Sequence, residues 1–149
     1  MGNRAVLTDK EKRVGVYIHW NGGRDSVEGY PKAARELRFR DPVDDPSYAM
    51  ARLTVAIGAF LGATDSCSIG IGRLEDLDCD NYDNGVYVLG EGWKVVGRYG
   101  NGAPDQAVEN PDWETTEAGG WNAEAQEKAD GIAKAIVLKL KAADDAEIA

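Results

Sequence analysis

The segment from Asp45 to Gly62 restricts the possible folds of this chain more than any other. Asp45 and Pro46 form a strong helix start, because an aspartate caps free N–H groups and a proline fits the first helical position. Apolar side chains then recur at spacings of three and four and also occupy the other faces, interrupted only by Arg52 and Thr54. A helix that is apolar nearly all round is buried, so we expect one central buried helix that ends at Gly62.

Five short segments carry the composition of β-strands, rich in β-branched and aromatic residues or alternating between apolar and small side chains. One pair flanks a charged turn and another flanks a glycine-rich turn, so each pair predicts a hairpin. The predicted strands are Arg4–Thr8, Arg13–Trp20, Ser66–Leu74, Val86–Leu89 and Trp93–Tyr99.

Two more helices complete the predicted fold. One follows a glycine turn, and Pro31 either lies late in its first turn or restarts the helix, with Lys32–Arg40 as the body. The other occupies residues 121–143 with one apolar stripe. Residues 101–120 are rich in Gly, Pro and Asp, so we expect an irregular loop there. Because hairpin signals dominate, we predict one α+β domain over residues 1–149, with a mainly antiparallel sheet of about five strands packed with about three helices.

The charge distribution argues against nucleic acid as a partner. The net charge is −9, of which residues 1–104 carry −2 and residues 105–149 carry −7. Binding to a nucleic-acid backbone requires clustered lysine and arginine, so we expect no direct nucleic-acid binding. An acidic surface keeps a protein in solution, mimics nucleic acid or docks on a basic protein face, and the sequence leaves these alternatives open.

Neither a membrane segment nor a secretory signal is expected. The longest mostly apolar stretch, Leu53–Ala63, is too short to span a bilayer, and the first residues lack the charged and apolar regions of a signal peptide. We therefore expect a cytoplasmic protein. Two cysteines and one histidine are too few for a disulfide scaffold or a zinc site, and we expect no cofactor.

The first candidate site is the glycine turn between a strand and a helix. A helix start exposes backbone N–H groups that suit a phosphate or a carboxylate. Arg24 is expected to clamp such an anion, Trp20 to stack on a planar ring, and His19 to exchange protons near neutral pH. With Asp25 or Ser26 as the helix cap, the candidate residues are His19, Trp20, Asn21, Gly22, Gly23, Arg24, Asp25 and Ser26.

A purely structural interpretation of this turn stays open, with Trp20 in the core and His19 partly buried. The two interpretations differ in what they expect of Arg24→Ala. If Arg24 lies in a polar turn and binds an anion, as we predict, the substitution weakens binding and leaves folding nearly unchanged. If Arg24 is a structural clamp, the substitution unfolds the domain.

The second candidate site is the acidic loop from Glu75 to Gly85, which has five carboxylates within nine residues. Such carboxylates attract hard cations, but the spacing is not that of an EF-hand, because the sixth and twelfth positions counted from Asp76 are Asn81 and Tyr87. We therefore expect no metal, and either an ordered polar loop or a loop that faces a ligand or partner. The residues of that loop proposed for contact are Asp78, Asp80, Asn81 and Asp83.

Three stretches resemble one known group of proteins: Met1–Val6, Val14–Glu28 and Leu77–Tyr87. They are similar to small acidic proteins encoded by bacteriophages, prophages and integrative elements, over roughly residues 1–100, whereas the C-terminal helix departs from that group. The resemblance implies a mobile-element origin, hence the host-cell cytoplasm, and no mechanism. Because both candidate sites carry it, we expect the two sites to share one surface.

These observations favour a non-enzymatic phage or prophage accessory protein that binds and inhibits or sequesters a host component. That component is a host defence or regulatory protein, or a small anionic, nucleotide-like ligand. The alternative is a small enzyme acting on a phosphorylated or nucleotide substrate, with His19 and the Asp78–Asp83 loop supplying acid, base or metal ligands. Convergence of His19, Arg24 and this loop in one cleft would favour a ligand site or an enzyme, and their separation would favour protein binding.

Overall fold

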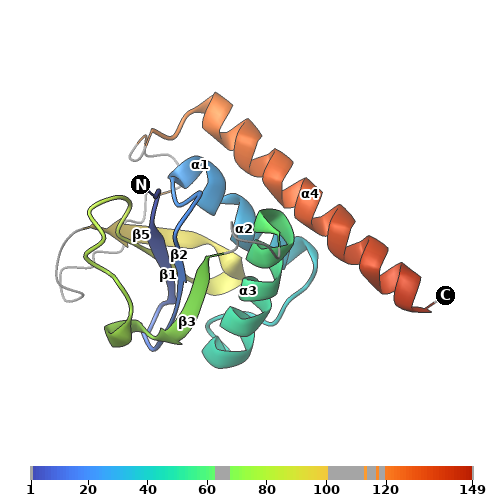
Figure 1. The fold of residues 1–149 in the computed structure, drawn as a ribbon, viewed down its shortest axis with the longest axis horizontal. Helices are drawn as coiled ribbons and strands as arrows, with labels where there is room; N and C mark the ends of the chain where they lie inside the picture. Colours follow the sequence, from blue (N-terminus) through green and yellow to red (C-terminus); the bar gives the residue numbers. More distant parts are fainter. Residues whose placement is uncertain (1, 63–67, 101–112, 114–116, 118–119, 149) are drawn as a thin grey trace.

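The computed structural model describes residues 2–62, 68–100, 113, 117 and 120–148. A five-stranded sheet lies on one side of the molecule, and helices cover one of its faces (Figure 1). The strands are β1 (Ala5–Asp9), β2 (Val14–Ile18), β3 (Ile69–Arg73), β4 (Val86–Leu89) and β5 (Val95–Tyr99). The helices are α1 (Arg24–Val27), α2 (Gly29–Glu36), α3 (Pro46–Leu61) and α4 (Ala123–Ile148), with single 3₁₀ turns η1 (Leu74–Asp76) and η2 (Glu91–Trp93).

The sheet has the order β3-β2-β1-β4-β5. Both predicted hairpins form, since β1 pairs with β2 and β4 pairs with β5 in antiparallel fashion, and β2 pairs with β3 in the same way. The two hairpins join through one parallel pair, β1 with β4, in which Val6 lies opposite Val86. The predicted α+β class with a mainly antiparallel sheet is confirmed.

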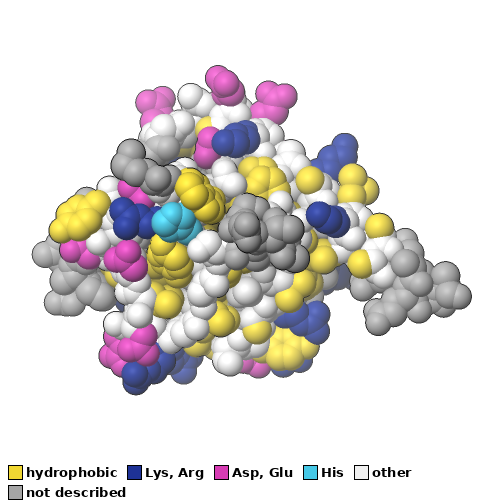
Figure 2. Space-filling model, viewed as in Figure 1, with side chains coloured by type: hydrophobic (Ala, Val, Ile, Leu, Met, Phe, Trp, Pro, Cys, Tyr) yellow, Lys and Arg dark blue, Asp and Glu magenta, His cyan; other side chains and the backbone are white. Residues whose placement is uncertain are grey.

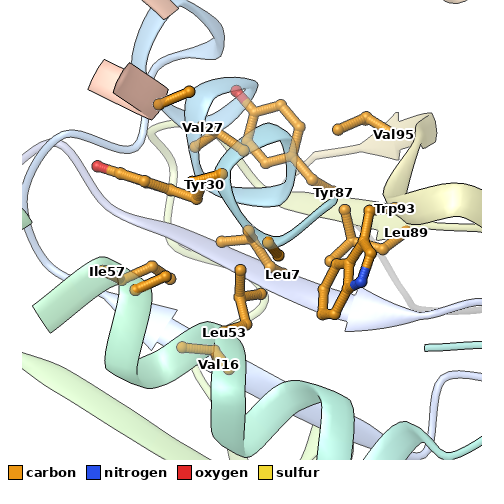
Figure 3. Close-up of a cluster of buried hydrophobic side chains, with 14 of the residues drawn as sticks. Leu7, Val16, Val27, Tyr30, Leu53, Ile57, Tyr87, Leu89, Trp93 and Val95 are labelled. Carbon is orange, nitrogen blue, oxygen red and sulfur yellow. The ribbon is translucent and has the colours of Figure 1, made fainter. Parts of the chain in front are cut away.

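Alternation along the strands creates an apolar layer on each face of the sheet. Leu7 and Val16 point toward the helices, where Leu53 and Ile57 of α3 meet them in the main core (Figure 3). On the other face, the smaller cluster around Val6 is covered by the acidic loop. The loop side chains Leu77 and Cys79 pack against this cluster, which also contains Leu74 just before the loop. The acidic loop therefore covers the second face of the sheet, and this packing fixes the position of the loop.

Helix α3 begins as predicted and is buried on fewer sides than predicted. The Asp45 carboxylate accepts a hydrogen bond from the Tyr48 N–H at 3.2 Å, and the helix ends before Gly62. Leu53 and Ile57 are fully buried. Val55, however, is 55% exposed, and Phe60 is only partly buried. The predicted central helix therefore lies in the core with one side buried, because the sheet, α2 and α4 cover that side of α3 while the other side meets solvent.

Other boundaries also differ from the prediction. Strand β3 begins at Ile69, and Ile71 is half exposed because β3 is an edge strand. The helix after the glycine turn is divided in two, because α1 and α2 follow each other with a break at Glu28. Pro31 lies in the first turn of α2, which ends at Glu36 and not at Arg40. The C-terminal helix runs five residues past 143, to Ile148. Most of the predicted irregular loop, and Cys67, lie outside the described residues.

Helix α4 lies across the outside of the helical layer (Figure 1). One side of it, including Ala129, Ile132, Ala133 and Ile136, is buried against the preceding helices. Within the part of the chain that the structure describes, no helix has the length and apolar character to cross a membrane.

Candidate functional site

The glycine turn is fastened to the core by its own backbone. The N–H of Gly22 donates to the carbonyl of Asn3 at 2.8 Å, and a Cβ added at Gly22 would lie 2.5 Å from that oxygen. The hydroxyls of Tyr30 and Tyr87 donate to the carbonyls of Asn21 and Gly22, each at 3.1 Å. Burial raises the pKa of Tyr87 to about 12, so this donor keeps its proton at physiological pH. Close backbone approach therefore explains why glycine stands at position 22.

The helix that follows the turn is a single turn of four residues, α1, with Gly23 in the cap position and no side-chain cap. The predicted caps, Asp25 and Ser26, lie inside the helix instead. Asp25 accepts a hydrogen bond from the Ser26 hydroxyl and pairs with Lys128 of α4 at 2.8 Å. The carboxylate of Asp25 thus connects α1 to α4, and so short a helix has only a small dipole for an anion.

The side chain of Arg24 is completely buried between two tryptophans. Its guanidinium carbon lies 3.9 Å from the ring centre of Trp113 and 4.6 Å from that of Trp121. Its Nη2 donates to the Trp113 carbonyl at 2.6 Å, and its Nε donates to Oε2 of Glu28 at 2.9 Å. The indole N–H of Trp113 donates to the same Glu28 oxygen at 2.9 Å. These contacts form an Arg24–Glu28–Trp113 network.

The expectation that Arg24 lies in an exposed polar turn is wrong. Arg24 is 1% exposed, because Trp113 and Trp121, which are distant in the sequence, close over its guanidinium. Its donors already bind protein acceptors, so the geometry favours the structural interpretation. An anion-binding role for the turn stays a prediction that these contacts do not support.

The acidic loop is an ordered polar loop built around Asn81, which is fully buried. Its side-chain N–H group donates to the carbonyls of Asp78 and Gly85 at 3.0 and 3.2 Å. Its side-chain oxygen accepts hydrogen bonds from the N–H groups of Asp83, Asn84 and Gly85 at 3.0 to 3.2 Å. One amide thereby connects Asp78 to the segment from Asp83 to Gly85 and holds the shape of this part of the loop.

Arg4 connects this loop to the start of β1. Its Nε donates to Oδ2 of Asp83 at 2.8 Å, its backbone N–H donates to the same oxygen at 3.0 Å, and Asp78 lies 3.7 Å from its Nη1. The hydrogen bond from the guanidinium, helped by the backbone bond, lowers the pKa of Asp83 below its ordinary value. Asn3 joins His19 to this loop, because its backbone N–H donates to the His19 carbonyl at 2.8 Å and its side-chain oxygen accepts a hydrogen bond from the Asn84 side chain at 2.5 Å.

His19 follows β2 on the same side of the sheet as the acidic loop. Its Nδ1 shares a hydrogen bond with the hydroxyl of Tyr17 at 2.9 Å, and Trp20 meets its ring edge-on with centroids 4.8 Å apart. Gly2 packs so closely on the ring that an added Cβ would lie 2.6 Å from Nε2. His19 and the acidic loop therefore lie near each other, as expected, but Arg24 is buried elsewhere beneath tryptophans.

Several side chains here point outward. Tyr82 is 73% exposed and Trp20 is 38% exposed, so Trp20 is not in the core as the structural interpretation expects. Figure 2 shows the single histidine with basic, acidic and apolar side chains gathered around it. We call this surface the His19 face. It consists of Arg4, His19, Trp20, Asp78, Asp80, Tyr82 and Asp83.

Sequence reasoning missed three parts of this arrangement. Arg4 and Tyr82 were not named as candidate site residues. Both belong to stretches that carry the resemblance, which was the available signal that they contribute to the site. No local pattern places Trp113 on Arg24, because the contact is long-range. Within the described residues, no group of three or more His, Cys, Asp or Glu side chains is arranged to hold a metal ion.

A comparison with protein-family models finds no match, and comparisons with curated proteins and with solved structures find no significant match either. The resemblance to proteins of phages and prophages therefore stays a prediction from the sequence.

Proposed function

We propose that this chain is a non-enzymatic accessory protein of a phage or prophage, and that it acts by binding a host protein through the His19 face. The two longer stretches that resemble mobile-element proteins supply most of this surface, His19 and Trp20 from one and Asp78 to Asp83 from the other. A surface formed by both stretches is a good candidate for the binding surface that the proteins of this group share.

The observation that carries the proposal is that Tyr82 is held in a left-handed backbone conformation with its ring exposed. Its φ is +59°, a left-handed conformation that costs a bulky residue on the order of 1 kcal/mol. The neighbouring Asn81 network holds the loop in this form, and the tyrosine ring is left 73% exposed. Strained residues held by their surroundings are concentrated at functional sites. An aromatic ring fixed in solvent on a rigid loop suits an interface, where Tyr, Trp and Arg dominate the binding energy.

The charges of the His19 face select the partner. The face carries three carboxylates, Asp78, Asp80 and Asp83, and one guanidinium, that of Arg4, which pairs with Asp83 and lies 3.7 Å from Asp78. The face is therefore net acidic, and its partner is a basic surface of a host protein with an apolar recess for the Tyr82 ring. Complementary charge of this kind accelerates association and makes it sensitive to salt.

The outward direction of these side chains favours a protein over the small nucleotide-like ligand and over a substrate. Small molecules are bound in concave sites that cover most of their surface. Tyr82 and Trp20 instead offer their rings to solvent, which is the arrangement that a protein surface can cover.

The proposal is tested by quantitative capture from host lysate, followed by measurement of Kd with the purified partner. Tyr82→Ala and Asp80→Asn remove an exposed ring and an exposed charge. The matched controls are Leu138→Ala, which removes another exposed apolar side chain, and Asp44→Asn, which removes an exposed charge on a different element.

The expected result is one basic protein that binds the unmodified chain and both controls equally. Tyr82→Ala should weaken this binding by about 2 kcal/mol or more, roughly 30-fold, as interface anchors do. Equal binding by Tyr82→Ala, Asp80→Asn and the controls would exclude the His19 face as the interface.

A further inference from the structure

A groove of about 610 Å³ lies between the segment that joins α2 to α3, helix α3 and the later part of α4. Among the described residues that line it, every charged side chain is an arginine: Arg38, Arg40 and Arg52. Tyr48, Val55 and Leu140 supply ring and apolar surface between them. The groove is thus basic and partly apolar in a chain whose net charge is −9.

The positive charge of this groove is only partly neutralised. Arg40 pairs with Asp45 at 3.2 Å, whereas Arg52 donates to the uncharged hydroxyl of Tyr48 at 2.5 Å. Neither Arg38 nor Arg52 forms an ion pair with any carboxylate of the described residues. The guanidinium carbons of Arg40 and Arg52 lie 4.3 and 4.9 Å from the centre of the same Tyr48 ring. Two like charges beside one ring repel each other, and an anion bound in the groove would offset this positive charge.

Arg38 stands at a backbone position where glycine is the common residue. Helix α2 ends in a Schellman motif, in which the N–H of Phe39 binds the carbonyl of Ala34 at 2.9 Å and the N–H of Arg38 binds that of Arg35 at 3.1 Å. Arg38 is the left-handed residue of this motif, with φ of +59°. Glycine adopts this conformation without the Cβ penalty, so arginine here lowers stability. Arg38 thus holds its guanidinium at the groove at a conformational cost.

We infer that this groove binds a small organic phosphate, with the phosphate between Arg38 and Arg52 and its apolar or aromatic part against Val55 and Leu140. Guanidinium groups bind phosphate through paired hydrogen bonds, and a phosphate offers more oxygens and charge to several arginines than a carboxylate does. The volume lies in the range of sites for small molecules. The site is distinct from the His19 face, so this inference does not depend on the proposed protein partner.

The test uses phenyl phosphate as the probe, with inorganic phosphate, benzoate and phenol as comparisons. Binding is followed by calorimetry and by NMR shifts of the backbone N–H groups of Arg38, Tyr48 and Arg52. The informative variants are Arg38→Gly and Arg52→Gln. Lys12→Gly is the matched control, because Lys12 is another basic residue with φ of +59° and lies in the turn between β1 and β2.

Phenyl phosphate should bind more tightly than each of the other three probes. Arg38→Gly should raise the Tm while weakening binding about tenfold to a hundredfold, the loss expected for one charge-assisted hydrogen bond. Arg52→Gln should weaken binding to a similar extent, and Lys12→Gly should leave it unchanged.

Three outcomes would overturn the inference. The first is no binding of phenyl phosphate at concentrations up to about 10 mM, because a Kd above about that value means little affinity. The second is unchanged binding in both Arg38→Gly and Arg52→Gln. The third is inorganic phosphate or benzoate binding as tightly as phenyl phosphate, which would show that the groove does not select an organic phosphate.

Discussion

Arg24 and Trp113 are 89 residues apart in the sequence, and the guanidinium carbon of Arg24 lies 3.9 Å from the centre of the Trp113 ring. Glu28 completes this contact, since it accepts hydrogen bonds from both side chains. The network therefore ties the helix after the glycine turn to the segment that precedes α4. It also gives a buried positive charge a partner, without which burial would be strongly unfavourable.

Arg24→Ala is expected to lower the free energy of unfolding by about 3–5 kcal/mol, because it breaks a buried ion pair and leaves the Glu28 carboxylate without its cation. Urea unfolding followed by circular dichroism measures this loss. Arg35→Ala is the control, since Arg35 is exposed on α2 and its loss should stay within about 0.5 kcal/mol. A loss below about 1 kcal/mol for Arg24→Ala would contradict the structural role.

Asn81→Ala is expected to destabilise the acidic loop and to free Tyr82. The substitution leaves three backbone N–H groups and two carbonyls without their side-chain partner, so the free energy of unfolding should fall by more than about 2 kcal/mol. Hydrogen exchange at Asp83, Asn84 and Gly85 should accelerate in this variant. Asp80→Asn, which changes an exposed side chain of the same loop, should leave exchange at these three N–H groups slow.

The Arg4–Asp83 pair gives a pH-dependent contribution to stability. The pKa of Asp83 is lowered in the folded chain, so the contribution is present at pH values above the ordinary aspartate pKa and is lost as the pH falls through the lowered value. In Arg4→Met the NMR-titrated pKa of Asp83 should rise toward its ordinary value. The stability difference between this variant and the unmodified chain should shrink below about pH 4. An Asp83 pKa that does not change in Arg4→Met would contradict this pairing.

Tyr99→Phe is expected to stabilise the protein. The Tyr99 hydroxyl is buried and has no hydrogen-bond partner among the described residues, and burial raises its pKa to about 12. Removing an unsatisfied hydroxyl should raise the free energy of unfolding by about 1 kcal/mol. Tyr87→Phe is the matched control, because it removes a hydroxyl that does donate a hydrogen bond, to Gly22, and should be destabilising. A lower Tm for Tyr99→Phe would mean that this hydroxyl is satisfied in solution.

Metal is expected to have no effect on the acidic loop, because its spacing is not that of a calcium loop and Arg4 already binds Asp83. Thermal unfolding with EDTA and with excess Ca²⁺ should give the same Tm. A rise of several degrees with Ca²⁺ would contradict this, because a ligand that binds only the folded state stabilises it by mass action.

Local chemistry made much of the fold predictable. Each hairpin is encoded by strand composition and an adjacent turn, and the start of α3 is encoded by Asp45 and Pro46. The degree to which Val55 is buried was not predictable, because it depends on how far α2 and α4 extend over α3.

The candidate site, like the fold, was predictable only where the signal lies in neighbouring residues of the sequence. The resemblance led to the expectation that His19 and the acidic loop share one surface, and Asn3 does connect the two through hydrogen bonds to His19 and Asn84. The environment of Arg24 depends on tryptophans that no local spacing relates to it. The left-handed position of Arg38 was not predicted, because the predicted helix continued to Arg40 whereas α2 ends at Glu36.

The parallel pairing of β1 with β4 has a consequence for how the chain acquires its structure. Val6 pairs with Val86, so the two central strands meet only after the intervening helices and β3 have been synthesised. Closing such a long loop is entropically unfavourable and slows folding relative to chains whose contacts are local. The hairpin of β1 and β2 can form early, but one edge of β1 then stays open until β4 arrives. During synthesis this edge is a free template for another strand, and the nascent chain is most prone to aggregate in that interval.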